Sequence, residues 1–342
     1  MQKRIITWYI AVLISLLLMI LIGGVTRLTD SGLSMVDWKL LLDVIPPLTE
    51  SSWQNAFNAY KQFPEYTHYH SHFSLSDFKF IYFWEYLHRF FARILGLIFI
   101  VPFLVFWLKG RFEKKEKRYL CLALLCGIFQ AFIGWYMVKS GLRDLPDISH
   151  FRLALHLSVA FLIVVLIAKA FLQRLYPIKN RSLTVPFMIG TGLFILTFVQ
   201  VVIGAFVSGL KAGYAFNTWP KMGSEWIPEN IFYLQPFYEN FLKNGFAIQF
   251  LHRHLGVVIL VATLGFAATL WKQKDRSLKY LLPTLLLLVS QVLLGIFTLV
   301  MHVPLVLASL HQLTATILLA SFVYYLHQCQ QKPIKKTKKS LH

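Results

Sequence analysis

The chain has 342 residues and a formal net charge of +19 at pH 7. Apolar residues make up 57% of it, charged residues only 14%, and the mean hydropathy is +0.59. This composition excludes an ordinary soluble globular domain. It predicts an all-α integral membrane protein, because a helix needs roughly 20 apolar residues to cross the hydrocarbon layer.

Eight apolar windows of that length follow one another and predict eight transmembrane helices. They lie near 5–25, 80–108, 119–138, 149–171, 184–208, 246–271, 279–301 and 304–327. The first window shows no small-residue cleavage site, so we expect a retained helix and not a signal peptide. No Arg- and Ser-rich extension precedes it, which favours a bacterial cytoplasmic (inner) membrane.

The basic residues set the expected orientation. Of the 34 Lys and Arg residues, 21 fall in five segments that an eight-helix topology places on one side: 3–4, 109–118, 169–181, 272–279 and 332–339. The positive-inside rule then predicts that both termini are cytoplasmic. The run at 335–339 is expected to contact anionic lipid of the bilayer, and no nucleic-acid role is expected.

Four histidines lie within the apolar segments: His88, His156, His252 and His311. Each is six to eight residues from a predicted helix start, which predicts a depth of roughly 9–12 Å below the outer boundary. An imidazole in a bilayer is costly unless it is hydrogen-bonded or ligates something. Two such pairs suit a planar metal macrocycle such as haem, which takes axial histidines. We therefore expect these four residues to be iron ligands at two sites toward the outer side.

The local sequences around two of these histidines repeat. Glu85-Tyr-Leu-His88-Arg89 resembles Gln249-Phe-Leu-His252-Arg253, which predicts two pseudo-symmetric four-helix bundles. We expect a first half at 1–178, a second half at 179–330 and a basic tail at 331–342. A Gln-x-x-x-Gly pattern begins at Gln130, Gln200 and Gln291, and is typical of close helix packing.

Glu85 is the informative break in the repeat, because position 249 holds Gln. One interpretation is an i,i+4 ion pair with Arg89. The other is a carboxylate that serves only the first site, by moving protons or by stabilising positive charge. Arg89, Arg93 and Arg253 are candidates to bind haem propionates through charge-assisted hydrogen bonds.

The remaining histidines have less specific patterns. His254 lies on another face of its helix than His252, and His150 and His302 fall near helix ends. His68, His70 and His72 have a spacing that could bind a transition metal, or they are ordinary residues of an aromatic outer loop.

Five motifs resemble the haem A synthase family over nearly all of the predicted helical region. They are residues 23–35, 46–48, 64–66, 85–89 and 212–220. The chain is similar to the cysteine-poor branch found in mitochondria and many Gram-negative bacteria, because residues 26–79 lack the paired cysteines of another branch.

The resemblance implies a function and a division of roles. It implies that His252 and His311 hold haem b, that haem O binds near His88 and His156, and that Glu85 takes part in catalysis. The expected reaction oxidises a methyl group of haem O to a formyl group by successive hydroxylations, with water as the oxygen source. The implied partners are haem O synthase and a haem-copper oxidase or its assembly factors, and an oligomer is compatible with the sequence.

Two other functions fit the residues without the resemblance. A di-haem, quinol-linked electron carrier also uses paired histidines on a helical bundle, but needs no carboxylate unique to one half. A haem transporter or chaperone binds haem reversibly and leaves its substituents unchanged.

Overall fold

The computed structural model describes residues 2–36, 45–141, 148–178 and 182–330, and within these ranges the regular structure is helical, with no β-strand. Eight helices are long and apolar enough to cross a membrane, which confirms the predicted number. They are α1 (Gln2–Leu28), α3 (Leu75–Leu108), α4 (Lys114–Gly141), α5 (His150–Leu175), α6 (Val185–Gly209), α7 (Gly245–Lys272), α8 (Leu278–Val300) and α9 (Leu305–Cys329).

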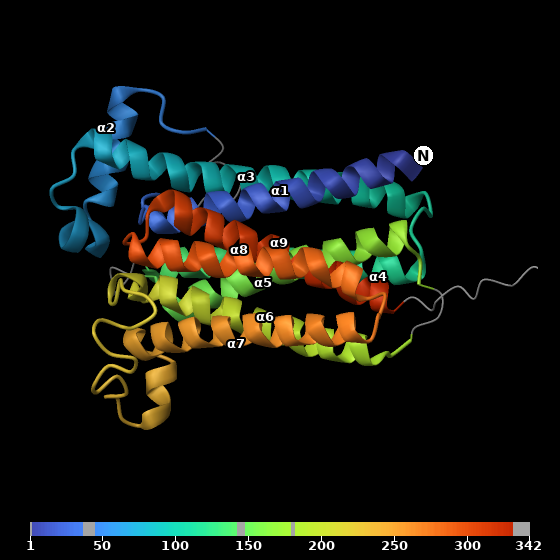
Figure 1. Ribbon diagram of the computed structural model, residues 1–342. Coiled ribbons are helices and arrows are strands. Elements are labelled where there is room, and N and C mark those ends of the chain that lie inside the picture. Colours follow the sequence, from blue (N-terminus) through green and yellow to red (C-terminus); the bar gives the residue numbers. More distant parts are fainter. Residues whose placement is uncertain (1, 37–44, 142–147, 179–181, 331–342) are drawn as a thin grey trace, which may run out of the picture.

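The shorter helices lie in two long connections. The connection from α1 to α3 holds α2 (Glu50–Tyr60) and the π-helical η1 (Tyr66–His70), and the one from α6 to α7 holds η2 (Ala212–Tyr214) and η3 (Phe237–Phe241). Figure 1 shows both connections at one end of the bundle, with the N-terminus and the end of α9 at the other. The tail at 331–342, with its basic run, lies outside the described residues.

The eight predicted helices agree with the structure to within five residues at each end, and the largest differences are the starts of α3 and α4, each predicted five residues late. A capping box begins α3 earlier: the Asp77 amide donates to Ser74 Oγ, and the Ser74 amide donates to the Asp77 carboxylate. A capping box satisfies the free backbone donors at the start of a helix. Its polar residues lie outside the apolar window from which this helix was predicted. His88 therefore stands thirteen residues after its helix start, whereas the other three histidines stand six or seven after theirs. The residue count from the helix start is therefore longer for His88, and equal depth in the membrane stays a prediction.

The helices pack around a central group. α5 and α9 contact each other and both α1 and α6, while α3 packs on α1, α4 on α5, and α7 on α6. α8 packs on both α7 and α9. In contrast, α3 and α4 make no comparable contact with each other, although only a short turn joins them. α7 and α8 thus pack directly on each other, whereas the backbones of α3 and α4 stay further apart and side chains from both join one buried cluster, with Phe103, Leu120 and Ala123 among its members.

A buried ion pair joins three helices near the end of the bundle where the chain begins. Glu116 on α4 is only 1% exposed. Its Oε2 lies 2.6 Å from Nη2 of Arg174 on α5, and its Oε1 accepts a 2.7 Å hydrogen bond from the Tyr9 hydroxyl on α1. The carboxylate therefore satisfies two buried partners at once.

Replacing this carboxylate should destabilise the fold. We expect Glu116→Ala to cost about 3–5 kcal/mol, because it leaves a guanidinium without its buried partner. Thermal unfolding of the purified protein, followed by size-exclusion chromatography, measures the loss. Glu113→Ala removes an exposed carboxylate one turn away and should leave the melting temperature nearly unchanged; equal effects of the two variants would contradict the expectation.

Candidate functional site

The second pair of predicted site histidines meets in the structure. His252 on α7 and His311 on α9 have ring centroids 6.4 Å apart, with the ring planes at 79°. Two imidazoles that ligate opposite sides of one metal, through bonds of about 2 Å, have centroids about 6 Å apart. The spacing therefore fits a single iron held between these two rings.

The first pair, His88 on α3 and His156 on α5, is also brought together, since the two side chains lie within range of electrostatic interaction. In all four histidines the Nδ1 atom is buried and has no hydrogen-bond partner. A buried polar atom without a partner costs free energy, and imidazole in an apolar bundle is retained where it binds something. The orphaned nitrogens fit a ligand that takes imidazole.

Each histidine faces a glycine of the preceding transmembrane helix. A Cβ atom built on Gly23, Gly134, Gly204 or Gly295 would lie 3.0, 3.3, 2.9 or 2.9 Å from the Cε1 atom of His88, His156, His252 or His311, respectively. Real Cβ atoms essentially never approach closer than 3.0 Å. A side chain at Gly204 or Gly295 would therefore push the imidazole, and one at Gly23 or Gly134 would crowd it, so glycine allows each ring to lie against the neighbouring helix.

This role of the glycines was missed in the Gln-x-x-x-Gly pattern, which we interpreted as helix packing alone. The signal was present, because each glycine occurs on the helix just before a histidine-bearing helix. Two of the glutamines also contact that next helix: Gln200 Nε2 donates to the His252 carbonyl at 2.8 Å, and Gln291 Nε2 lies 3.3 Å from His311 Nε2.

The Glu85 carboxylate is 3% exposed and accepts hydrogen bonds on both oxygens. Its Oε1 accepts from Arg89 Nη2 at 2.5 Å, which confirms the i,i+4 ion pair. Its Oε2 accepts from the Ser34 hydroxyl and from the Met35 amide, each at 2.7 Å. The segment after α1 thus folds over α3 and presents donors to this one carboxylate.

The matching position in the second half has the opposite polarity. Gln249 donates through Nε2 to the Phe216 carbonyl at 3.3 Å, so the segment after α6 presents an acceptor. The exchange of Glu for Gln between the halves is therefore matched by an exchange of donors for an acceptor in the loop above.

The two Arg residues of the repeat hold these same loops. Arg89 Nη2 donates to the Met35 carbonyl at 3.0 Å. Arg253 donates to the carbonyls of Phe216, Thr218 and Lys221. Arg93 lies one turn further along α3 than Arg89 and is partly exposed. The predicted binding of propionates by these three arginines stays a prediction.

In the first outer connection, Tyr60 organises the segment that contains the histidine triplet. Its hydroxyl donates to Glu65 at 2.9 Å and lies 2.6 Å from His70 Nδ1. Burial and the Glu65 carboxylate raise the pKa of the Tyr60 phenol, and burial lowers the pKa of His70. Among the described residues no group of three or more His, Cys, Asp or Glu side chains could hold a metal ion, so the structure does not support metal binding by His68, His70 and His72.

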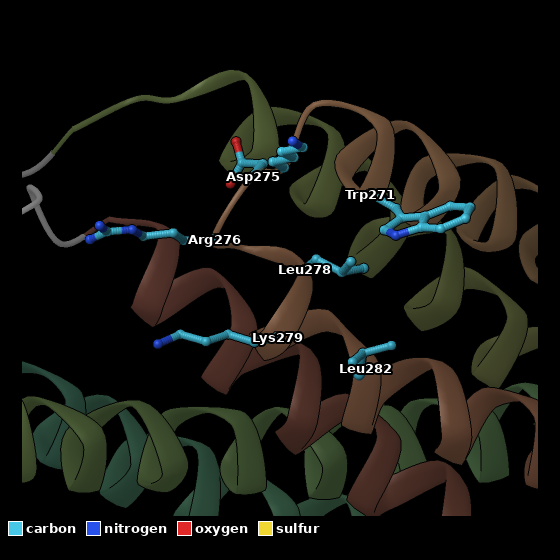
Figure 2. A pocket seen from close by; sticks show the side chains of 7 residues that line it. Trp271, Asp275, Arg276, Leu278, Lys279 and Leu282 are labelled. Atoms are coloured by element: carbon cyan, nitrogen blue, oxygen red, sulfur yellow. The ribbon is translucent and has the colours of Figure 1, made fainter.

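A cavity of about 350 Å³ lies at the turn from α7 to α8. Figure 2 shows Arg276 and Lys279 extending to one side of this turn, and Trp271 and Leu282 lying toward the other. Trp271 is nineteen residues beyond His252 on α7, which corresponds to about 28 Å along the helix. This cavity is therefore separate from the histidine sites.

The family model and the similar proteins agree on one family. The model of the COX15-CtaA family, described as cytochrome oxidase assembly protein, matches residues 6–323. A haem A synthase of Flavobacterium johnsoniae is 41% identical over 337 residues, which cover 96% of this chain and 98% of that protein. Haem A synthases of Wolbachia pipientis from Culex pipiens and of Nitrosospira multiformis are 41% and 38% identical, over 95% and 97% of this chain and 97% and 95% of their own lengths.

Removing the Arg253 guanidinium should loosen the connection from α6 to α7. We expect Arg253→Ala to speed tryptic cleavage after Lys221 at least about tenfold, since a hydrogen bond to a charged group contributes roughly 1.5–3 kcal/mol. Limited proteolysis with mass spectrometry measures the rate. Arg276→Ala, an exposed arginine beyond the other end of α7, is the matched control. An unchanged cleavage rate in Arg253→Ala would show that other contacts hold the connection.

Proposed function

Because the chain belongs to the COX15-CtaA family, together with haem A synthases that match it over nearly their whole length, we propose that it oxidises a methyl group of haem O to the formyl group of haem A. The observation that carries this proposal is the buried Glu85 carboxylate, one turn from His88. A carboxylate in one half alone suits an enzyme better than a symmetric electron carrier or a haem transporter.

The proposed architecture is a duplicated four-helix unit, with halves at 1–178 and 179–330. Its support is the repeated pairing of a histidine with a glycine of the preceding helix: His88 and His156 with Gly23 and Gly134, and His252 and His311 with Gly204 and Gly295. The loop-holding arginines, Arg89 and Arg253, recur at matching positions.

We assign the two histidine pairs different occupants. His252 and His311 hold haem b, for which their 6.4 Å ring separation is suitable. His88 and His156 receive haem O as the substrate. Bound haem b supplies one-electron redox chemistry. Arg93, four residues beyond Arg89 on α3, is a candidate for a propionate of the substrate.

In the proposed reaction, Glu85 acts on the substrate side of the site. Conversion of a methyl group and a water molecule to a formyl group releases four protons and four electrons. The reaction therefore needs an external electron acceptor, to which haem b would pass the electrons one at a time, and the site must accept protons and tolerate positive charge. The Glu85 carboxylate is held by Ser34, Met35 and Arg89. This fixed anion stabilises positive charge that develops at the methyl carbon, or takes a proton from the attacking water.

The proposed setting is a bacterial cytoplasmic membrane with both termini in the cytoplasm. The histidine sites then lie toward the outer side, beneath the connections that hold α2 and η3. The proposed partners are haem O synthase, which supplies the substrate, and a haem-copper oxidase or its assembly factors, which receive the product. The family description as cytochrome oxidase assembly protein supports the second of these.

Loss of the carboxylate should abolish conversion without abolishing haem binding. We expect Glu85→Ala to lower haem A formation at least about a hundredfold, the lower range for a lost acid–base group. Haems extracted from membranes that also contain haem O synthase are separated by chromatography. Glu50→Ala, an exposed carboxylate of the first outer connection, should behave as the wild type.

The same experiment decides between the functions. Haem A in the wild type and its loss in Glu85→Ala would support an oxidising enzyme with its chemistry at the first pair. Haem O and haem B alone in a folded, haem-loaded wild type would refute the synthase. Unaltered haem A formation in Glu85→Ala would refute the role of Glu85.

The haem b site can be tested separately through its glycines. We expect Gly204→Leu to abolish haem b retention by His252 and His311, because the new side chain would meet the His252 ring. Gly192→Leu on the same helix meets no atom within 4 Å of its Cβ and should keep the haem. The haem content of the purified proteins, from absorbance spectra, measures the effect; full retention in Gly204→Leu would place haem b elsewhere.

A further inference from the structure

One layer of side chains lies two helical turns beyond each histidine pair, toward the middle of the bundle. It is found by moving seven residues from each histidine and from each facing glycine, which is about 10 Å along a helix and nearly the same helix face. Beyond the second pair these positions are Ile259, Leu288 and Leu318, which are 1%, 4% and 2% exposed, together with the buried Thr197. The three apolar residues belong to one buried cluster, so the layer is filled.

Beyond the first pair the corresponding layer is filled less completely. Its members are Leu16, Leu95, Gly127 and Ile163, and the three apolar residues belong to one cluster, Leu16 as a buried member and the other two as partly buried ones. Gly127 stands where the second half has the buried Leu288, and no atom lies within 4 Å of a Cβ built on it. Leu95 and Ile163 are only partly buried, whereas their counterparts Ile259 and Leu318 are buried. We call these four residues the open layer.

The helix packing agrees with this difference. α7 and α8, which carry Ile259 and Leu288, pack against each other. α3 and α4, which carry Leu95 and Gly127, make no comparable contact. The open layer is therefore apolar, lies beneath His88 and His156, and is not closed by contact between these two helices.

We propose that the open layer binds the farnesyl chain of haem O, which passes from the macrocycle at His88 and His156 toward the middle of the membrane between α3 and α4. This inference rests on the proposed function. The layer offers only apolar side chains, which suit an isoprenoid chain. Leu288 fills the equivalent space in the second half, which suits a haem that carries no such chain.

The space also gives the substrate a route that the second site lacks. A bound haem b must stay, so its layer can be packed as a protein core is packed. A substrate with a long apolar chain must enter and its product must leave, and an unclosed side between α3 and α4 lets the chain exchange with lipid.

Gly127→Leu tests the proposal, because it places in the first half the residue that the second half has. The probes are haem O and haem B, which differ in the presence of the farnesyl chain, titrated into purified protein whose second site is already loaded. We expect the affinity for haem O to fall at least about tenfold, because several buried methylenes lose their place. The affinity for haem B should change little, and Gly127→Ala should give a smaller loss of haem O.

Gly192→Leu is the matched control, since it adds the same side chain at a glycine with open surroundings on another helix. Equal weakening of haem O and haem B by Gly127→Leu would mean that the position limits the macrocycle and would overturn the subsite. Unchanged affinity for haem O in both Gly127 variants would also overturn it. A wild type that prefers haem O to haem B but forms no haem A would overturn the proposed function and leave the chain subsite standing.

Discussion

The close approach of an imidazole ring to a glycine backbone is the constraint on which this structure depends. It occurs four times, from Gly23 against His88 to Gly295 against His311, always between consecutive transmembrane helices. A Cβ on the facing residue would crowd the ring, most of all at Gly204 and Gly295, so glycine sets how near the two helices come. The contact also buries the imidazole away from lipid, where an unpaired polar ring would be costly. Helix spacing and ligand geometry are therefore decided by the same residues.

Above these contacts, the outer loops are part of the site and not merely connections. Arg89 and Arg253 each donate to a backbone carbonyl of the loop that precedes their helix, so the loops are held at matching places. The loops differ where function is expected to differ. One offers the Ser34 hydroxyl and the Met35 amide to Glu85, and the other offers the Phe216 carbonyl to Gln249. A Gln at position 85 would place an amide N–H donor where the carboxylate now accepts hydrogen bonds from Ser34, Met35 and Arg89. Its effect on activity would therefore mix lost charge with a disturbed loop.

Hydropathy and charge were enough to predict the eight helices, because long apolar runs in a membrane protein have few alternatives. The start of α3 was not predicted correctly, because Ser74 and Asp77 extend the helix with polar capping residues, which a search for apolar windows does not detect. The pairing of histidines was predictable from repeated motifs. The loop contacts were not predictable. Arg253 bonds to backbone carbonyls more than thirty residues earlier, and the residue types at those positions do not indicate such a bond. The proposed role of Gly127 could not be predicted from the sequence either, because it follows from comparing Gly127 with Leu288 in the folded structure.

The two histidine sites then differ in a way that suits the ligand we propose for each. A site that keeps its haem gains from a filled layer, because every buried methyl group there adds to stability, and Ile259, Leu288 and Leu318 supply it. A site that turns over its haem cannot be filled in the same way without opposing product release. On this view the same duplicated frame serves a permanent cofactor and an exchanging substrate through one difference in side-chain volume and one difference in charge.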